Sequence, residues 1–188
     1  RTAHQILDST VHENTAQLTE DFRMPEAETS PLQNDQHHSI LIFGASGDLT
    51  ARKLMPALFT LWSEGFLPDD SPIFGVARRE KTDDEFRAEM KAAVSKHGRS
   101  GEIPDYKWQK FSQRLFYHRL DLDTLEGYVG LHARVEETEA EVFGPDVAAS
   151  RVVYLAITPS LFLTSVENLC AGGFKPTHDE THRLRVVV

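Results

Sequence analysis

The chain has 188 residues, of which 40% are hydrophobic and 26% charged, and its formal net charge is −9 at pH 7. This length and apolar content suffice for one α/β domain of moderate size, and no apolar run approaches the length of a membrane span. The acidic balance argues against a nucleic-acid-binding surface. A single cysteine, Cys170, excludes an internal disulfide and a metal site built from cysteines.

The first 38 residues differ in composition from the rest of the chain. They are rich in polar and acidic residues, contain few large apolar ones, and include Pro25 and Pro31. Because so polar a segment buries little apolar surface, we predict a flexible polar leader over residues 1–38. Its composition fits neither a transit peptide nor a signal peptide, which favours a cytoplasmic location. The adjacent His37 and His38 diverge, so a linker is favoured over a metal site.

An apolar run at residues 40–43 predicts a short strand buried on both faces, because central strands of parallel sheets lack alternation. Gly44 and Gly47 follow and allow a sharp turn close to a bound group. From Asp48 onward the composition is helical. A strand, a glycine turn and a helix N-terminus together present N–H groups and a positive dipole end, which suit a phosphate or diphosphate.

The glycine spacing by itself leaves the ligand open. The usual dinucleotide pattern Gly-x-Gly-x-x-Gly is not met, since Ser46 and Leu49 stand at its second and third glycine positions. A P-loop is disfavoured because no Gly-Lys-[Ser/Thr] follows at the required distance. A purely structural turn between a strand and a helix is therefore an alternative at this point.

A second apolar run, residues 73–77, predicts the next strand of a βαβ unit, after a helix whose expected apolar face is Leu54, Leu58, Leu61 and Trp62. Arg78 and Arg79 follow this strand directly. In NAD-specific sites an acid usually stands here for the adenosine ribose, whereas an arginine accommodates the 2′-phosphate of NADP. The pair therefore indicates NADP, with an exposed basic pair of no function as the alternative.

Together these motifs resemble the N-terminal coenzyme domain of the glucose-6-phosphate dehydrogenase family. The resemblance rests on residues 44–49, 52–54 and 56–58 and on the pattern Gly75-x-Ala77-Arg78. In that family the glycine turn has the form Gly-x-x-Gly-Asp-Leu, so the departure from the usual pattern becomes a match. The resemblance implies a Rossmann-type, doubly wound α/β fold with a mainly parallel sheet and helices on both faces.

The resemblance also implies a set of site residues. Arg78, with Arg79 beside it, holds the 2′-phosphate of NADP. Lys53 faces the junction of coenzyme and sugar phosphate and is assigned to the substrate, glucose 6-phosphate. The residues that wrap the NADP diphosphate are Gly44, Ala45, Ser46, Gly47, Asp48, Leu49, Thr50 and Ala51.

Scaffold elements follow the arginine pair. Thr82 and Glu85 have the spacing of a capping box, and Gly98 closes the predicted helix, whose apolar stripe is Phe86, Met90, Ala93, Val94 and His97. Residues 100–110 are predicted as a loop and residues 115–120 as a strand.

The next predicted helix opens at Asp123-Thr124 and stops at Gly144-Pro145. Its expected apolar face is Leu125, Tyr128, Val129, His132 and Val135. Its acidic residues are interpreted as a solvated face, and they are Glu136, Glu137, Glu139 and Glu141.

Residues 152–157 predict a third buried parallel strand, which Thr158-Pro159 breaks at the sheet edge where α/β proteins bind ligands. In the resembled family a Tyr-Leu-Ala-x-x-Pro segment borders the nicotinamide, which implies Tyr154 and Pro159 as coenzyme neighbours. Pro159 would lie in a turn that can carry a cis peptide bond. A core aromatic is the alternative for Tyr154.

An amphipathic helix is predicted before Gly172-Gly173, with Cys170 on its apolar face as a buried, inert thiol. The segment between His178 and His182 differs from the zinc motif His-Glu-x-x-His in its acid and has loop composition, so we predict a surface loop and no metal site. Residues 184–188 predict a fourth parallel strand.

In the resembled family this last strand leads into Glu-Lys-Pro-Phe-Gly and then a large domain with a catalytic His and its Asp partner. Neither lies in the chain, so we expect a partial NADP-binding domain over residues 39–188, truncated at its C-terminus, with no catalytic residue and no turnover alone. The full-length enzyme would oxidise glucose 6-phosphate to 6-phosphogluconolactone, the first step of the pentose phosphate pathway. It would form a homo-oligomer through the absent domain.

Two other functions stay open from the sequence. One is another NADP-dependent sugar oxidoreductase with a Rossmann domain, and the other is a non-enzymatic nucleotide-sensing module. In each case we expect neither a nucleic-acid nor a membrane partner.

Overall fold

The computed structural model describes residues 37–99, 103–175 and 184–188. Its centre is a five-stranded sheet in the order β3-β2-β1-β4-β5, and each neighbouring pair is parallel. The strands are β1 (His38–Phe43), β2 (Ile73–Ala77), β3 (Leu115–Arg119), β4 (Ser150–Leu155) and β5 (Leu184–Val187). This arrangement confirms the Rossmann-type fold.

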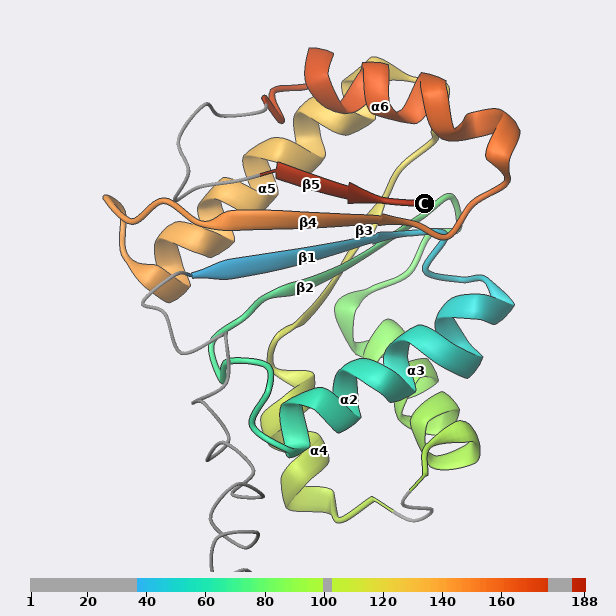
Figure 1. Cartoon of the computed structure of the whole chain (residues 1–188), viewed down its shortest axis with the longest axis vertical. Coiled ribbons are helices and arrows are strands. Elements are labelled where there is room, and N and C mark those ends of the chain that lie inside the picture. Colours follow the sequence, from blue (N-terminus) through green and yellow to red (C-terminus); the bar gives the residue numbers. More distant parts are fainter. Residues whose placement is uncertain (1–36, 100–102, 176–183) are drawn as a thin grey trace, which may run out of the picture. The chain divides into compact units, whose positions relative to one another are not determined.

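Helices cover both faces of the sheet (Figure 1). One face carries the short π-helix η1 (Thr50–Leu54), α2 (Met55–Ser63), α3 (Asp83–His97) and α4 (Asp105–Ser112). The other face carries α5 (Leu125–Phe143) and α6 (Phe162–Ala171), which the short 3-10 turn η2 (Pro159–Leu161) precedes. In the described part of the chain, none of these helices has both the length and the hydropathy to cross a membrane.

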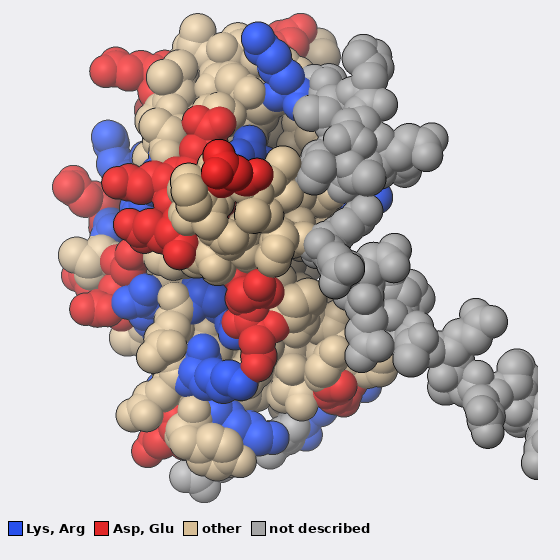
Figure 2. Space-filling model, turned by 90° about the vertical axis from the view of Figure 1, so that its left-hand side faces the viewer, with Lys and Arg blue, Asp and Glu red and all other residues tan. Residues whose placement is uncertain are grey.

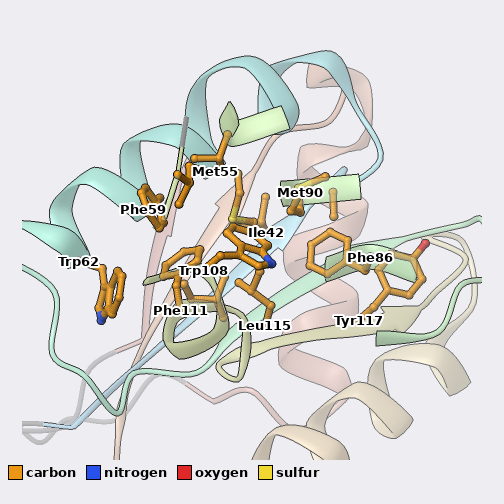
Figure 3. Packing of buried hydrophobic residues seen from close by; sticks show 14 residues of the cluster. Ile42, Met55, Phe59, Trp62, Phe86, Met90, Trp108, Phe111, Leu115 and Tyr117 are labelled. Atoms are coloured by element: carbon orange, nitrogen blue, oxygen red, sulfur yellow. The ribbon is translucent and has the colours of Figure 1, made fainter. Parts of the chain in front are cut away.

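Each face of the sheet has its own apolar core, and β1 contributes to both. Ile42 packs in the core shared with α2, α3 and α4, whereas Leu41 and Phe43 pack in the core under α5 and α6. This two-sided burial explains why the strand is apolar without alternation. Figure 3 shows the first core, where the rings of Phe86 and Tyr117 lie side by side with centroids 5.3 Å apart.

Strand boundaries differ slightly from the predictions. β1 begins at His38, which pairs with Ser150, so the last residue of the predicted leader belongs to the sheet. The His37 ring packs against Phe143, with centroids 4.4 Å apart. β4 spans 150–155 and not 152–157, because its register with β1 ends at Leu155.

The prediction of a loop over residues 100–110 was wrong from residue 105 onward. Residues 105–112 form α4, and Trp108 and Phe111 are buried against Phe59 of α2. Two buried apolar residues in an eight-residue helix are too few to show a period, so packing stabilises this helix more than local pattern does.

Two of the predicted apolar helix faces were correct in part: Leu54, Leu58 and Trp62 of α2 contact the core, and Tyr128 and Val135 of α5 are buried. In α2 the buried side chains include Met55, Phe59 and Trp62, while Leu61 is 43% exposed. In α5, Leu125 and Val129 are exposed, and the buried residues are Tyr128, Leu131, Val135, Thr138 and Glu139. Each real face follows the 3-4 spacing that a helix needs to meet a flat sheet along one stripe.

Two single-residue predictions were also wrong. Cys170 is exposed, because Ser165 and Leu169 occupy the buried face of α6. Glu139 is only 4% exposed, and its carboxylate accepts hydrogen bonds from the Arg151 guanidinium at 2.6, 3.0 and 3.2 Å. It therefore belongs to a buried ion pair between α5 and β4, not to a solvated face.

The capping box is confirmed. The Thr82 backbone N–H donates to Glu85 Oε2 at 2.7 Å, and the Glu85 N–H donates to Thr82 Oγ1 at 3.2 Å. The Thr82 backbone N–H, and next the Thr82 hydroxyl, which donates to the same Glu85 oxygen at 3.1 Å, hold the pKa of the Glu85 carboxyl below its usual value because they favour the charged form. The predicted loop around His178 and His182 lies outside the described residues.

Candidate functional site

A groove of about 940 Å³ lies at the carboxyl edge of the sheet, where the arrowheads of β1, β4 and β5 lie together in Figure 1. Four segments that are far apart in the sequence form most of its wall. They are the turn after β1 (Gly44, Ser46, Gly47, Leu49), the end of β2 (Arg78, Arg79), the link from β3 to α5 (Asp121, Leu122, Asp123) and the segment after β4 (Ala156, Ile157, Thr158, Pro159).

The glycine turn is fixed by the backbone of its neighbours. The N–H groups of Gly44 and Ala45 both donate to the Val76 carbonyl oxygen, at 2.9 and 3.1 Å, which ties the turn to the end of β2. Gly44 has φ +86°, and a Cβ there would lie 2.1 Å from the Ala156 carbonyl oxygen. Glycine is therefore required at this position, both for its backbone conformation and for the close approach of the segment after β4.

A helix begins directly after the turn, since the backbone is helical from Asp48 and continues through η1 into α2. The buried Thr50 hydroxyl donates to the Gly44 carbonyl oxygen at 3.1 Å, so the first helical turn also holds the glycine turn in place. The positive end of this helix lies beside the groove, which favours an anion there.

The arginine pair lies on the same groove as the glycine turn. The hydroxyl of the buried Tyr117 donates to the Arg79 carbonyl oxygen at 2.5 Å, so β3 fixes the backbone that carries the pair. Asp121 and Asp123 line the groove as well. The groove therefore combines a cationic pair with carboxylates that can accept hydrogen bonds from a sugar or a base.

Hydrogen bonds beneath the groove join α3, β3 and α5. The Asp83 carboxylate accepts a hydrogen bond from the Tyr117 backbone N–H at 2.6 Å. One guanidinium nitrogen of Arg134 also donates to it and lies 2.9 Å from each of the two carboxylate oxygens. Burial of the His118 ring, and next the charge of Arg134, lower the pKa of His118. The bonds to Asp83 hold Tyr117, whose hydroxyl donates to the Arg79 carbonyl oxygen just after β2.

Eight of the residues predicted from the sequence line this groove: Gly44, Ser46, Gly47, Leu49, Arg78, Arg79, Tyr154 and Pro159. Tyr154 is half-buried, and the Thr158–Pro159 peptide bond is trans, with Pro159 at the start of η2.

The other predicted site residues lie outside the groove wall. Ala45 and Thr50 are fully buried and support the turn from within. Asp48 and Lys53 are exposed, and Ala51 is half-buried, on the first helical turns after the groove. The structure thus brings the glycine turn and the arginine pair together but does not bring Lys53 to them.

Sequence reasoning missed three polar residues at or near the groove. Asp121 and Asp123 reach it only because β3 lies beside β2 in the sheet. Lys81 does not line the groove but contacts Ser46, which does: the Ser46 hydroxyl oxygen lies 3.3 Å from the Lys81 ammonium. Lys81 could have been found from the sequence, because it is a third cation only three residues after Arg78.

On the face that Figure 2 shows, acidic and basic side chains are interspersed, with no broad area of one sign. The cations that line the groove, Arg78 and Arg79, would attract a phosphate locally.

A parallel sheet with a glycine turn after its central strand and a ligand groove at the strand-order switch defines the class of dinucleotide-binding α/β domains. The family model described as "Glucose-6-phosphate dehydrogenase, NAD binding domain" matches residues 41–188. The chain belongs to this family.

Relatives support the same assignment. The chain is 45% identical over 130 residues to glucose-6-phosphate 1-dehydrogenase of Chlamydia pneumoniae, an alignment that covers 69% of the chain and 25% of the relative. It is 35% identical over 156 residues to the Kluyveromyces lactis enzyme of the same name, covering 83% of the chain and 30% of that enzyme.

Two solved structures share the fold. One, titled "Glucose-6-phosphate dehydrogenase in complex with its substrate glucose-6-phosphate", has a TM-score of 0.70 and 35% identity, covering 82% of this chain and 30% of its own. The other is glucose-6-phosphate 1-dehydrogenase from Mycobacterium avium, with a TM-score of 0.63 and 25% identity, covering 80% and 29%. The chain thus spans between 25% and 30% of the length of these relatives.

Proposed function

We propose that the chain is the coenzyme-binding part of an NADP-dependent glucose-6-phosphate dehydrogenase. The single observation that carries this proposal is the shared groove, which has the glycine turn on one wall and the Arg78–Arg79 pair on another. Its volume lies within the range of about 300–1,000 Å³ that is usual for ligand and cofactor sites. Family membership favours this function over the two alternatives that the sequence left open.

The residues of the groove fit a dinucleotide. Gly44 makes room for the backbone after β4, and Gly47 carries no side chain on the groove wall, so a diphosphate can approach the backbone there and the helix N-terminus together. Arg78 and Arg79 follow β2 where an NAD-specific site would have an acid, and guanidinium groups bind phosphate dianions through paired hydrogen bonds. We therefore assign the 2′-phosphate of NADP to this pair and the diphosphate to the turn.

Tyr154 and Pro159 are assigned to the nicotinamide end. Both line the groove beyond the glycine turn, at the end of β4. When bound, NADP supplies a hydride acceptor at C4 of its nicotinamide ring. The contribution of this chain is to hold that ring in one position and to exclude water from one of its faces, and we assign no catalytic acid or base within it.

The substrate assignment follows from the family. A structural neighbour is titled as a complex with glucose 6-phosphate. We propose the same substrate for the full-length gene product, with the exposed Lys53 ammonium available to its phosphate. We also propose a homo-oligomeric assembly and a cytoplasmic location; a relative from Nicotiana tabacum is named chloroplastic, so localisation of the tagged full-length protein tests the latter.

Titration of the chain with NADP⁺ and NAD⁺, followed by calorimetry, tests coenzyme binding directly. We expect NADP⁺ to bind at least about tenfold more tightly, because the 2′-phosphate adds charge-assisted hydrogen bonds. A chain that folds but binds neither dinucleotide, or binds both equally, would refute the assignment. For the full-length gene product, NADPH formation from glucose 6-phosphate is the expected activity, and its absence would refute the substrate.

A further inference from the structure

Lys81 connects the segment after β2 to the glycine turn. Its ammonium lies 3.3 Å from the Ser46 hydroxyl oxygen and forms an ion pair with Glu89 of α3. The Lys81 side chain is only 14% exposed, and its ammonium lies 5.8 Å from the centroid of the buried Tyr117 ring. These contacts hold the ammonium in one place, unlike that of a solvated surface lysine.

The contact decides what the Ser46 hydroxyl can do. An ammonium has three donors and no acceptor, so Ser46 must accept the hydrogen bond from Lys81. Its own O–H is then directed away from Lys81 and is available as a donor. Because Ser46 lines the groove together with Arg78 and Arg79, an anion bound there can take that hydrogen bond.

The segment that carries the arginines is fixed at two points. Tyr117 holds the Arg79 carbonyl group, and Lys81 is bonded to Ser46 and Glu89. Both contacts set the position of the arginine pair relative to the glycine turn. Glu89 also compensates the charge of Lys81, so the effect of Lys81 on an anion is mainly geometric.

We propose that Lys81 is a positioning residue for the 2′-phosphate of NADP. It holds Ser46 as a hydrogen-bond donor and keeps the Arg78 segment against the turn. The proposal rests on the proposed function and adds to it a determinant of coenzyme specificity that does not itself line the groove.

The test measures Kd for NADP⁺ and NAD⁺, and the kinetic constants, in the full-length gene product. Lys81→Met should raise Kd for NADP⁺ about fivefold and that for NAD⁺ less than about twofold, since one hydrogen-bond donor is misdirected. KM for NADP⁺ should rise in parallel while kcat changes little. Lys81→Arg, which keeps a cationic donor, should recover most of the affinity.

Two further variants separate geometry from charge. Lys81→Met combined with Glu89→Gln removes both charges, and the loss of NADP⁺ affinity should persist. In a Ser46→Ala background, Lys81→Met should have no additional effect, because the two residues act through one hydrogen bond.

Equal losses for both coenzymes, recovery of affinity in the charge-neutral pair, or additive losses with Ser46→Ala would overturn the proposal. A wild-type protein without preference for NADP⁺ would overturn the proposed function and this inference with it. A wild-type preference that Lys81→Met leaves unchanged would overturn this inference alone.

Discussion

A Cβ atom on Gly44 would lie 2.1 Å from the carbonyl oxygen of Ala156, so the turn after β1 touches the backbone after β4. This close approach brings the assigned diphosphate end of the groove next to its nicotinamide end. Because backbone, and not a flexible side chain, occupies the space, the approach leaves no room for a substitution.

We predict that Gly44→Ala destabilises the chain by about 3–5 kcal/mol and abolishes dinucleotide binding, because a positive φ and a backbone overlap act together. Gly65→Ala is the matched control, since Gly65 has φ +79° with nothing within 4 Å of its Cβ position. It should cost only about 1 kcal/mol. Urea unfolding of both variants checks this, and equal losses would mean that the contact with Ala156 is not strained.

We expect Arg78→Glu to weaken NADP⁺ binding by about 2–3 kcal/mol and to leave NAD⁺ binding nearly unchanged, because only NADP carries the 2′-phosphate. Arg99→Glu makes the same charge change on an exposed residue just past the end of α3 and should affect neither coenzyme. Calorimetric titrations at one salt concentration give the affinity of each of the two variants for each of the two coenzymes. A similar loss for NADP⁺ and NAD⁺ would show that Arg78 is structural.

Because Glu139 and Arg151 form a buried ion pair, we predict that removing the carboxylate of Glu139 strongly lowers the free energy of unfolding. Glu139→Ala leaves the Arg151 guanidinium, which is 19% exposed, without its carboxylate and should lower the free energy of unfolding by about 3 kcal/mol. Glu141→Ala removes an exposed carboxylate from the same helix and should change it by less than about 0.5 kcal/mol. Chemical denaturation measures the free energy of unfolding of both variants. Similar losses would mean that Glu139 is as solvated as Glu141, as the sequence predicted.

Burial of His118 predicts a pH dependence of stability. Its pKa in the folded state is lowered from about 6.5, first by desolvation and then by Arg134. Below pH 6.5 the unfolded chain therefore binds the proton more readily than the folded one, so stability falls as the pH decreases from there toward the folded pKa. His118→Gln should reduce this slope between pH 7.5 and 5.5, provided that the glutamine packs in its place.

The control for this prediction is His97→Gln, whose side chain is exposed at the end of α3. Unfolding free energies from urea titrations at several pH values provide the slopes. A slope that His118→Gln leaves intact would assign the pH dependence to another group, such as His132, whose pKa burial also lowers.

Local patterns in the sequence were enough to predict much of the fold. The apolar runs of β1 and β2, the Thr82–Glu85 capping box and the helix end at Gly98 depend on neighbours within a few residues, and all are present. The glycine turn and the arginine pair were likewise visible, because a βαβ unit places the ends of two successive parallel strands at one sheet edge.

Tertiary structure alone decided which faces are buried and which polar groups meet. It made α4 a helix, left Leu61 and Cys170 exposed, and buried Glu139 against Arg151. It also joined Lys81 to Ser46 across 35 residues of sequence and left Lys53 outside the groove. The sequence determined the parallel α/β class and the glycine turn through short-range backbone preferences, whereas contacts between distant segments form only when the sheet packs, and no local pattern encodes them.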